Sequence, residues 1–298
     1  MQFRPENDSN FKAYLAWVTI CVIWGTTYLA IKIGVTDLPP FLFAGFRWII
    51  AGPLFLLILV LRKYKLPSFS DIKHLAVVGT LLLGFGNGLV VVGEQWLPSG
   101  LTSLLITTLP FWIVGLESFV PKGPKLNSTI ILGLLSGLIG VAIIFSENLT
   151  DIWKTDYFPG VVSLLIAMFA WGSGTVYSKY NKVTVHPIMG AAVQMIIAGI
   201  LQLTLGFSLG EWGKFNFTVE SLYAFGYLTF VASIFGYGSY MYAISRLPIS
   251  FVSTYTYINP VIALTLGWIV LNETINFEII IGMIVIFIGV TLVKRGAD

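Results

Sequence analysis

Two matching sets of side chains could bind a small molecule within apolar stretches of this sequence. Trp24, Tyr28 and Lys32 are spaced by four residues, so they share one face of a helix. The same spacing recurs half a chain length later, from Trp171 to Lys179. A tryptophan at mid-membrane depth needs a protein partner or a cavity for its N–H group. We predict an aromatic wall for stacking or cation–π contact with a substrate, with tight helix packing as the alternative.

Polar side chains that precede two prolines form a second candidate binding patch. Pro110 and Pro260 lie near the middle of apolar segments and lack a backbone N–H, so each frees a carbonyl one turn earlier. Such carbonyls are tolerated at membrane depth where protein or water satisfies them. We predict a helix hinge at each proline and ligand hydrogen bonding nearby; a kink that only improves packing is the alternative. The predicted ligand contacts here are Thr107, Thr108, Tyr255 and Asn259.

Three further polar residues belong to the same predicted cavity. Asn87 and Tyr237 occupy matching places in the two halves, within glycine-rich apolar segments. Both could reach a central cavity, although the flanking glycines equally permit plain close packing of helices. Thr175 lies one helical turn after Trp171 and completes the predicted substrate-binding set.

Charged residues inside apolar segments are functional candidates by default. Arg47 lies within the second segment, and Gln194 is at the matching position of the second half. We expect Arg47 to bind an anionic group, to gate the outer mouth or to hydrogen-bond helix-end carbonyls. Lys32 and Lys179 lie near segment ends, where they can snorkel to water. No aspartate or glutamate lies at mid-depth. Proton-coupled transport would need an acid near a segment end, such as Glu94, so the sequence does not support proton coupling.

Residue patterns of enzymes and metal sites are missing from the sequence. His74 and His186 are the only histidines, and Cys21 is the only cysteine, so neither a Cys/His cluster nor an intrachain disulfide is expected. We therefore predict no catalytic residues, no metal and no cofactor.

The composition indicates that the bilayer is the main solvent. Of the 298 residues 56% are apolar and only 10% are charged, against about 25% charged in soluble domains. A membrane-spanning helix needs roughly 20 apolar residues. The segments of this kind cover residues 13–33, 40–61, 74–93, 99–119, 127–145, 158–178, 187–208, 222–245, 249–271 and 276–293.

These ten segments form two units of five. Pro40 and Gly52 recur half a chain length later as Pro187 and Gly199, and other rare residues follow in the same order. Because five is an odd number, the second unit enters the membrane from the opposite side, as in inverted-repeat transporters. We predict an all-α membrane protein of ten transmembrane helices in two inverted five-helix repeats. Its parts are a cytoplasmic tail (1–12), the first repeat (13–145), an outer loop (146–157), the second repeat (158–293) and a cytoplasmic tail (294–298).

The distribution of basic residues predicts the orientation. With the N-terminus inside, the outer loops hold only Lys154 and Lys214 of all lysines and arginines. The positive-inside rule therefore puts both termini in the cytoplasm. Short basic runs are explained by anchoring beside the membrane, so we expect the lipid bilayer and a small molecule as partners, and no nucleic acid.

An ordered set of motifs resembles the EamA-type transporters of the drug/metabolite transporter superfamily. The resemblance implies a bacterial inner-membrane carrier of small metabolites, often amino acids, with a central cavity built from spans 1, 3, 4, 6, 8 and 9. Such proteins often carry an acid thirteen residues after the mid-span proline of each half; here the second half has Glu273 and the first half has Gly123. The residues that carry the resemblance are Trp24-Gly25-Thr26-Thr27-Tyr28, Pro39-Pro40 followed by Arg47, Leu109-Pro110, and Asn259-Pro260 with Gly267-Trp268 and Asn272-Glu273.

Together these features predict a secondary transporter that works by alternating access. Aromatic and neutral polar lining favours a neutral, zwitterionic or amphipathic metabolite such as an amino acid, with export as the expected direction. A channel-like facilitator, a nucleotide-sugar or other metabolite carrier and a membrane-embedded enzyme are the alternatives. The sequence predicts neither the coupling ion nor the oligomeric state.

Overall fold

The computed structural model describes residues 6–121, 123, 127–146, 154–271 and 277–297, and these residues form helices and loops without a strand. Asn272, Glu273 and most of the predicted outer loop 146–157 lie outside the described residues. The first half contains α1 (Glu6–Gly25), α2 (Thr27–Asp37), α3 (Pro40–Leu61), α4 (Phe69–Gly79), the π-helical η1 (Thr80–Asn87), α5 (Gly88–Gly93), α6 (Ser99–Ile106), α7 (Leu109–Ser118) and α8 (Ser128–Ile144). The second half contains η3 (Thr155–Tyr157), α9 (Phe158–Tyr180), α10 (Pro187–Ser208), α11 (Val219–Tyr227), the π-helical η4 (Leu228–Tyr237), α12 (Gly238–Arg246), α13 (Ile249–Val252), α14 (Tyr255–Leu271) and α15 (Phe277–Ala297).

Each predicted segment is helical, but not every one is a single long helix. In the described part of the chain, eight helical stretches are long and apolar enough to cross a membrane. The fifth segment is the shorter α8, of 17 residues, and the ninth is divided between α13 and α14. Large apolar side chains such as Leu57, Leu132 and Phe287 are more than half exposed on the outer surface, as expected where lipid tails are the solvent.

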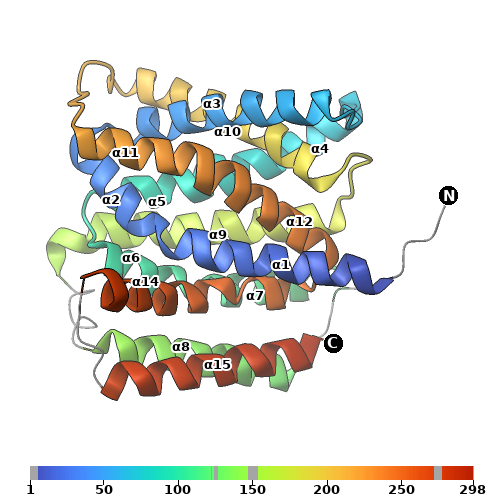
Figure 1. The fold of residues 1–298 in the computed structure, drawn as a ribbon, viewed down its shortest axis with the longest axis vertical. Helices are drawn as coiled ribbons and strands as arrows, with labels where there is room; N and C mark the ends of the chain where they lie inside the picture. Colours follow the sequence, from blue (N-terminus) through green and yellow to red (C-terminus); the bar gives the residue numbers. More distant parts are fainter. Residues whose placement is uncertain (1–5, 122, 124–126, 147–153, 272–276, 298) are drawn as a thin grey trace.

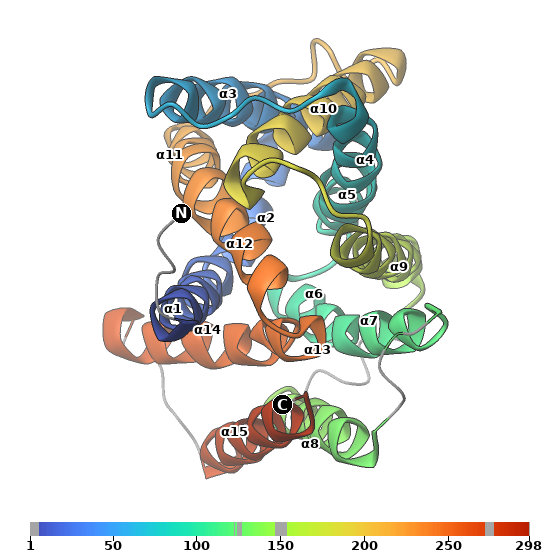
Figure 2. The same ribbon diagram turned by 90° about the vertical axis from the view of Figure 1, so that its right-hand side faces the viewer.

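Corresponding helices of the two halves pack against each other at both ends of the molecule. α3 lies along α10 at one end and α8 along α15 at the other, with the remaining helices between them (Figures 1 and 2). A Cβ atom on Gly140 would meet the carbonyl of Gly282, and one on Gly289 would meet the carbonyl of Gly133. These contacts are reciprocal, since Gly133 corresponds to Gly282 and Gly140 to Gly289. The contacts therefore follow a two-fold relation in which α8 and α15 run antiparallel.

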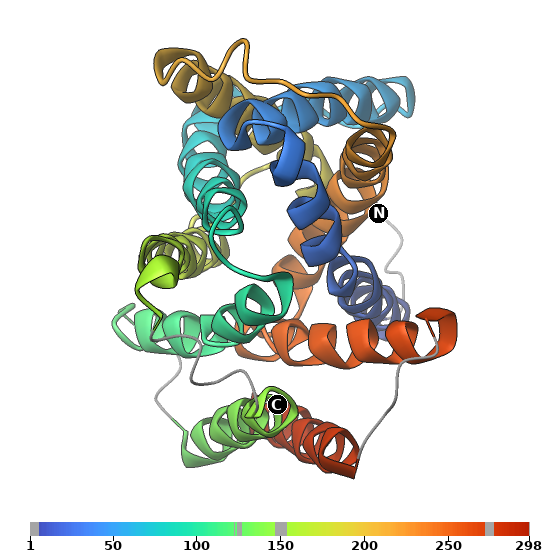
Figure 3. The same ribbon diagram turned by 90° about the vertical axis from the view of Figure 1, so that its left-hand side faces the viewer.

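The helix that carries Trp24 is interrupted, although the sequence predicts one continuous helix. α1 ends at Gly25, α2 begins at Thr27, and Thr26 forms the turn between them. The carbonyl of Ile23 accepts from the Thr26 amide (3.2 Å), the Thr26 hydroxyl (2.7 Å) and the Tyr227 hydroxyl (3.3 Å). The break is stable at membrane depth because these donors satisfy the carbonyl that the helix leaves free. α1 also packs beside α14 (Figures 2 and 3).

The interruptions near the two prolines differ. In the first half the break lies at Thr107 and Thr108, and Pro110 is in the first turn of α7, which begins at Leu109. In the second half Pro260 lies inside α14, and the helix breaks earlier, at Ser253 and Thr254. The helix break near Pro260 thus lies toward the N-terminus of the span, while a hinge at either proline stays a prediction. Hydroxyl groups at both breaks bond to nearby carbonyls.

A single methyl group at the α8–α15 crossing tests this packing. A Cβ atom at Gly289 would lie 2.6 Å from the backbone nitrogen of Gly137. We expect Gly289→Ala to destabilise the detergent-solubilised protein by about 1–3 kcal/mol, because the two backbones must separate. Thermal unfolding would measure this as a lower melting temperature.

Gly115→Ala is the matched control, because a Cβ atom there meets nothing within 4 Å. We expect it to be neutral or to stabilise its helix by about 0.5–1 kcal/mol. Equal melting temperatures for the two variants would contradict the close backbone contact.

Candidate functional site

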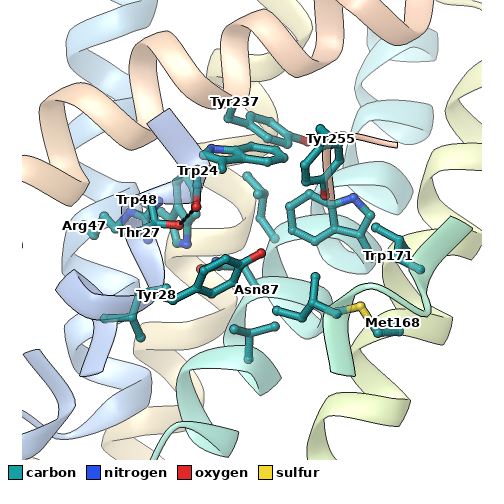
Figure 4. A pocket seen from close by; sticks show the side chains of 15 residues that line it. Trp24, Thr27, Tyr28, Arg47, Trp48, Asn87, Met168, Trp171, Tyr237 and Tyr255 are labelled. Carbon is teal, nitrogen blue, oxygen red and sulfur yellow. Dashed lines mark hydrogen bonds between the residues drawn. The ribbon is translucent and has the colours of Figure 1, made fainter. Parts of the chain in front are cut away.

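A central pocket lies where the two halves meet, and both of the candidate tryptophans line it. Its wall comes from α1, α2, α3, η1, α5, α6, α7, α9, η4 and α14. Seven predicted residues lie on this wall: Trp24, Tyr28, Arg47, Asn87, Trp171, Tyr237 and Tyr255. Thr27, Trp48 and Met168 also line it, and Figure 4 shows Arg47, Trp48 and Thr27 at one edge and Met168 at the opposite edge.

The aromatic residues of the pocket pack mainly on one another. The ring of Trp24 lies 5.5 Å from Trp171, 5.0 Å from Tyr255 and 5.3 Å from Tyr240, measured between centroids. The Trp171 N–H donates to the Tyr240 hydroxyl at 3.1 Å, and the Trp24 N–H donates to the carbonyl of Ala232 at 3.4 Å. Both tryptophans therefore have protein partners at membrane depth.

This aromatic cluster leaves little free space. The central pocket has a volume of about 60 Å³, whereas small-molecule sites typically have roughly 300–1,000 Å³. A metabolite therefore fits only after the walls move apart, and the structure holds the pocket closed.

Sequence reasoning missed Tyr240. It follows Tyr237 by three residues, which places both side chains on one face of the helix. Tyr240 is fully buried, stacks near Tyr237 and shares a 2.6 Å hydrogen bond with the Thr175 hydroxyl. The spacing from Tyr237 is the signal that could have found it.

Four predicted site residues lie behind the pocket wall rather than on it. The hydroxyls of Thr107 and Thr108 donate to the carbonyls of Leu104 and Leu105, at 2.5 and 2.8 Å. They thereby satisfy the carbonyls at the α6–α7 break. The Thr175 hydroxyl also lies 2.8 Å from the Trp171 carbonyl.

Asn259, the fourth of these residues, joins three helices. In the orientation that satisfies its amide group, its nitrogen donates to the carbonyls of Tyr255 (2.9 Å) and Cys21 (3.1 Å). Its oxygen then accepts from the Tyr28 hydroxyl at 3.2 Å. Asn259 therefore positions the pocket residue Tyr28 and lies outside the lining.

Arg47 and its neighbours form the polar end of the pocket. The Arg47 Nε donates to the Ser233 hydroxyl at 2.8 Å, and the guanidinium lies 4.2 Å from the centre of the Trp48 ring. Arg47 Nη1, Asn87 Oδ1 and the Trp48 N–H are buried, and none of them has a hydrogen-bond partner among the described residues. A buried guanidinium without an anionic partner is costly, so this end of the pocket favours a carboxylate ligand.

Gln194, the counterpart of Arg47, lies on the wall of a second cavity. The Tyr237 hydroxyl donates to Gln194 Oε1 at 2.6 Å, so this pair stands between the central pocket and the second cavity. The second cavity has a volume of about 350 Å³, and its charged or ionisable lining residues are His74, Lys179, Lys182 and Arg246.

The lysines of the two repeats make equivalent hydrogen bonds. Lys32 Nζ donates to the carbonyls of Glu94 (2.6 Å) and Leu97 (3.1 Å). In the second half, Lys179 Nζ donates to the carbonyls at positions 244 (3.2 Å) and 247 (3.1 Å). Each amino group thus caps the carbonyl end of a helix, where a positive charge is favourable. Both lysine side chains are only partly buried, and their predicted extension to water stays a prediction.

The amino-acid sequence matches a known family twice. The model of the EamA-like transporter family matches residues 11–146 and again residues 158–295. A protein of Escherichia coli (strain K12), "Uncharacterized inner membrane transporter YedA", is 33% identical over 284 residues, which cover 94% of this chain and 90% of the relative. "Uncharacterized transporter YoaV" of Bacillus subtilis (strain 168) is 29% identical, covering 94% of this chain and 95% of its own.

Two further proteins have lower sequence identity; one is informative by its name and the other by its solved fold. The "Probable amino-acid metabolite efflux pump" of Salmonella typhimurium (strain LT2) is 26% identical, covering 91% of this chain and 90% of its own. A solved crystal structure with 20% identity has a TM-score of 0.78 and covers 96% of this chain and 98% of its own. That structural likeness shows the shared fold.

The Trp171–Tyr240 hydrogen bond can be tested with a double-mutant cycle. We expect Tyr240→Phe to destabilise the protein by about 1–3 kcal/mol, because it leaves the buried Trp171 N–H without a partner. In a Trp171→Phe background, which lacks that N–H, the same change should cost less. Additive losses of thermal stability would show that Tyr240 does not satisfy this donor.

Proposed function

Because the chain belongs to the EamA-like transporter family, we propose that it exports a small zwitterionic metabolite, an amino acid or related compound, by alternating access. The family and the names of the relatives point to membrane transporters of the drug/metabolite transporter superfamily and not to enzymes. A transporter of this kind contacts the lipid bilayer and a small-molecule substrate. The Salmonella relative, named as an amino-acid metabolite efflux pump, supports the proposed substrate class and direction.

The unpartnered polar atoms of the central pocket carry this proposal. Arg47 Nη1 offers a hydrogen bond and a positive charge to a carboxylate, and Asn87 Oδ1 offers an acceptor to an ammonium group. The aromatic rings of Trp24 and Trp171 would then surround the remainder of the ligand. One small site thus presents a cationic group, a neutral acceptor and an aromatic wall, which together fit a zwitterion.

The closed pocket supports alternating access rather than a continuous channel. The packed aromatic rings and the Tyr237–Gln194 hydrogen bond separate the central pocket from the second cavity. Passage therefore requires that helices move, and the interruption at Thr26 provides a break in α1–α2 where the two segments can reorient. We propose that ten spans in two inverted repeats carry out this movement.

The charge distribution supports an orientation. With both termini in the cytoplasm of a bacterial inner membrane, the second cavity faces the cytoplasm. Its basic side chains Lys182 and Arg246 would attract a carboxylate to the mouth from which an exporter loads its substrate.

Ligand-induced stabilisation tests the proposed site. Purified protein is heated with a panel of amino acids, amines, nucleosides and nucleotide sugars. A ligand at 100 times its Kd should add roughly 2.7 kcal/mol of stability. We expect a saturable shift with amino acids, a much weaker one after Arg47→Gln, which copies the residue of the second half, and a weaker one after Asn87→Ala.

Lys182→Gln is the control, because Lys182 lines the second cavity and not the central pocket. Its charge would affect the rate of loading at the mouth and not the contacts of the bound ligand, so it should leave the equilibrium shift intact. A shift that survives Arg47→Gln but is lost in Lys182→Gln would place the substrate in the second cavity and contradict the proposal. A panel in which only nucleotide sugars act would contradict the substrate class.

A further inference from the structure

Glu94 is a buried acid that the proposed transport site does not use. It follows α5 at the outer end of the third span, and its side chain is fully buried. Neither carboxyl oxygen has a hydrogen-bond partner among the described residues. The nearby Lys32 amino group donates instead to the backbone carbonyls of Glu94 and Leu97. A buried carboxylate without hydrogen bonds is expensive, so such a group takes up a proton and becomes neutral.

The second repeat provides an internal control for this position. Ile244 occupies the place of Glu94, and Lys179 donates to the carbonyls of Ile244 and Leu247 just as Lys32 does to those of Glu94 and Leu97. We call the two hydrogen bonds from each lysine to these carbonyls the lysine clamp. In the second repeat the lysine clamp forms although the residue at the position of Glu94 is apolar. Helix capping does not explain why the first repeat has a carboxyl group there.

The position of Glu94 relates it to the central pocket. Asn87, Val90 and Glu94 follow one another at intervals of three and four residues, so they share one face of the helix. Asn87 and Val90 line the pocket. Glu94 therefore lies on the same helix face, one turn toward the outer end, where a path from the pocket to the outside would run.

The groups around Glu94 favour its neutral form. The helices packed against α5 include α2, α3 and α9. α2 carries the ionisable residues Tyr28, Lys32 and Asp37, and Asp37 accepts a hydrogen bond from the Thr218 hydroxyl. α3 carries Arg47, and α9 presents the uncharged Gly160 and Leu164 to Gly93. Burial raises the pKa of the Glu94 carboxyl well above its usual range, and the positive charge of Lys32 opposes part of that rise.

We propose that Glu94 is a proton-binding site whose ionisation accompanies opening of the outer end of the transporter. In the closed structure the carboxyl group is protonated. When the outer end opens, water reaches the group, its O–H bond breaks, and the proton leaves to the external water while the carboxylate keeps the electron pair. The inference relies on the proposed function in two respects: the orientation with both termini in the cytoplasm, and the outer end as one gate of a carrier.

The sign of the pH dependence follows from linkage. The closed state binds the proton more tightly, so low external pH favours it, and raising the pH favours the open state. Between the two pKa values, the open-to-closed ratio should change about tenfold per pH unit, because one proton is exchanged. If Glu94 were instead ionised and paired with Lys32 in the closed state, high pH would favour closure.

Cysteine labelling from outside measures opening without any substrate. In a Cys21→Ala background, Ile31→Cys places a reporter at a pocket-lining position that is only 3% exposed. Intact cells receive a membrane-impermeant maleimide across a pH series. Trp212→Cys, at a position that is 65% exposed, corrects for the pH dependence of the thiol itself.

We expect the corrected labelling rate of Ile31→Cys to rise with pH, and this rise to be lost in Glu94→Gln and Glu94→Ile. The second substitution copies the second repeat, so it should preserve the lysine clamp. Glu117→Gln is the matched control, because Glu117 is also buried but accepts a 2.8 Å hydrogen bond from Tyr180; it should keep the pH dependence.

Infrared difference spectra of the substrate-free protein between neutral and alkaline pH provide an independent measurement. They should show a protonated carboxyl band that Glu94→Gln removes. A flat or inverted labelling profile, an unchanged profile in Glu94→Gln, or the absence of that band would overturn the proposal. Because neither measurement uses a ligand, a failed ligand panel would leave this result unaffected, and the reverse also holds.

Discussion

The structure depends on one constraint: inside a bilayer, polar atoms must find partners within the protein. Regular helices meet it automatically, but a pocket at mid-depth requires irregular backbone. Side chains of the protein itself donate hydrogen bonds to the free carbonyl groups of this irregular backbone. The Thr26 and Tyr227 hydroxyls serve the carbonyl of Ile23, and the Gln202 amide donates to the carbonyls of Leu83 and Gly84 in the π-helical η1, at 2.8 and 3.1 Å. The helices around the pocket can therefore be interrupted without exposing unsatisfied groups to lipid.

Against this background the few buried atoms that remain unsatisfied are informative. The two repeats share a backbone plan, so each residue of one half can be compared with its counterpart. The Tyr237 hydroxyl bonds to Gln194 and closes one side, and Gln194 Nε2, which belongs to a residue of the second cavity, has no partner among the described residues. The corresponding Asn87 and Arg47 instead have unpartnered polar atoms and line the central pocket. Comparing matching positions of the two repeats thus distinguishes polar groups that stabilise the fold from polar groups that are available to a ligand or a proton.

In the proposed function, the aromatic cluster serves both stability and transport. In the closed state Trp24, Trp171 and Tyr240 satisfy one another through ring contacts and hydrogen bonds. A substrate must replace those contacts with its own, so only a ligand that binds the opened pocket more tightly than the closed one can shift the equilibrium. For the proposed zwitterionic substrate, the Arg47 end would supply such a difference, because the guanidinium would gain an anionic partner only when substrate is bound.

The sequence by itself determined the all-helical membrane architecture, the two-unit layout and seven residues of the pocket wall. These follow from local quantities: the length of apolar runs, the recurrence of rare residues and the spacing of Trp24 and Tyr28 on one helix face. Other features required the tertiary structure. The break at Thr26, the displaced break before Pro260 and the burial of Asn259 behind the wall depend on partners far along the chain, such as Tyr227 and Cys21. The closed state of the pocket and the isolation of the Glu94 carboxyl were likewise decided by packing between helices, because burial and hydrogen-bond satisfaction are properties of the assembled fold and not of any single segment.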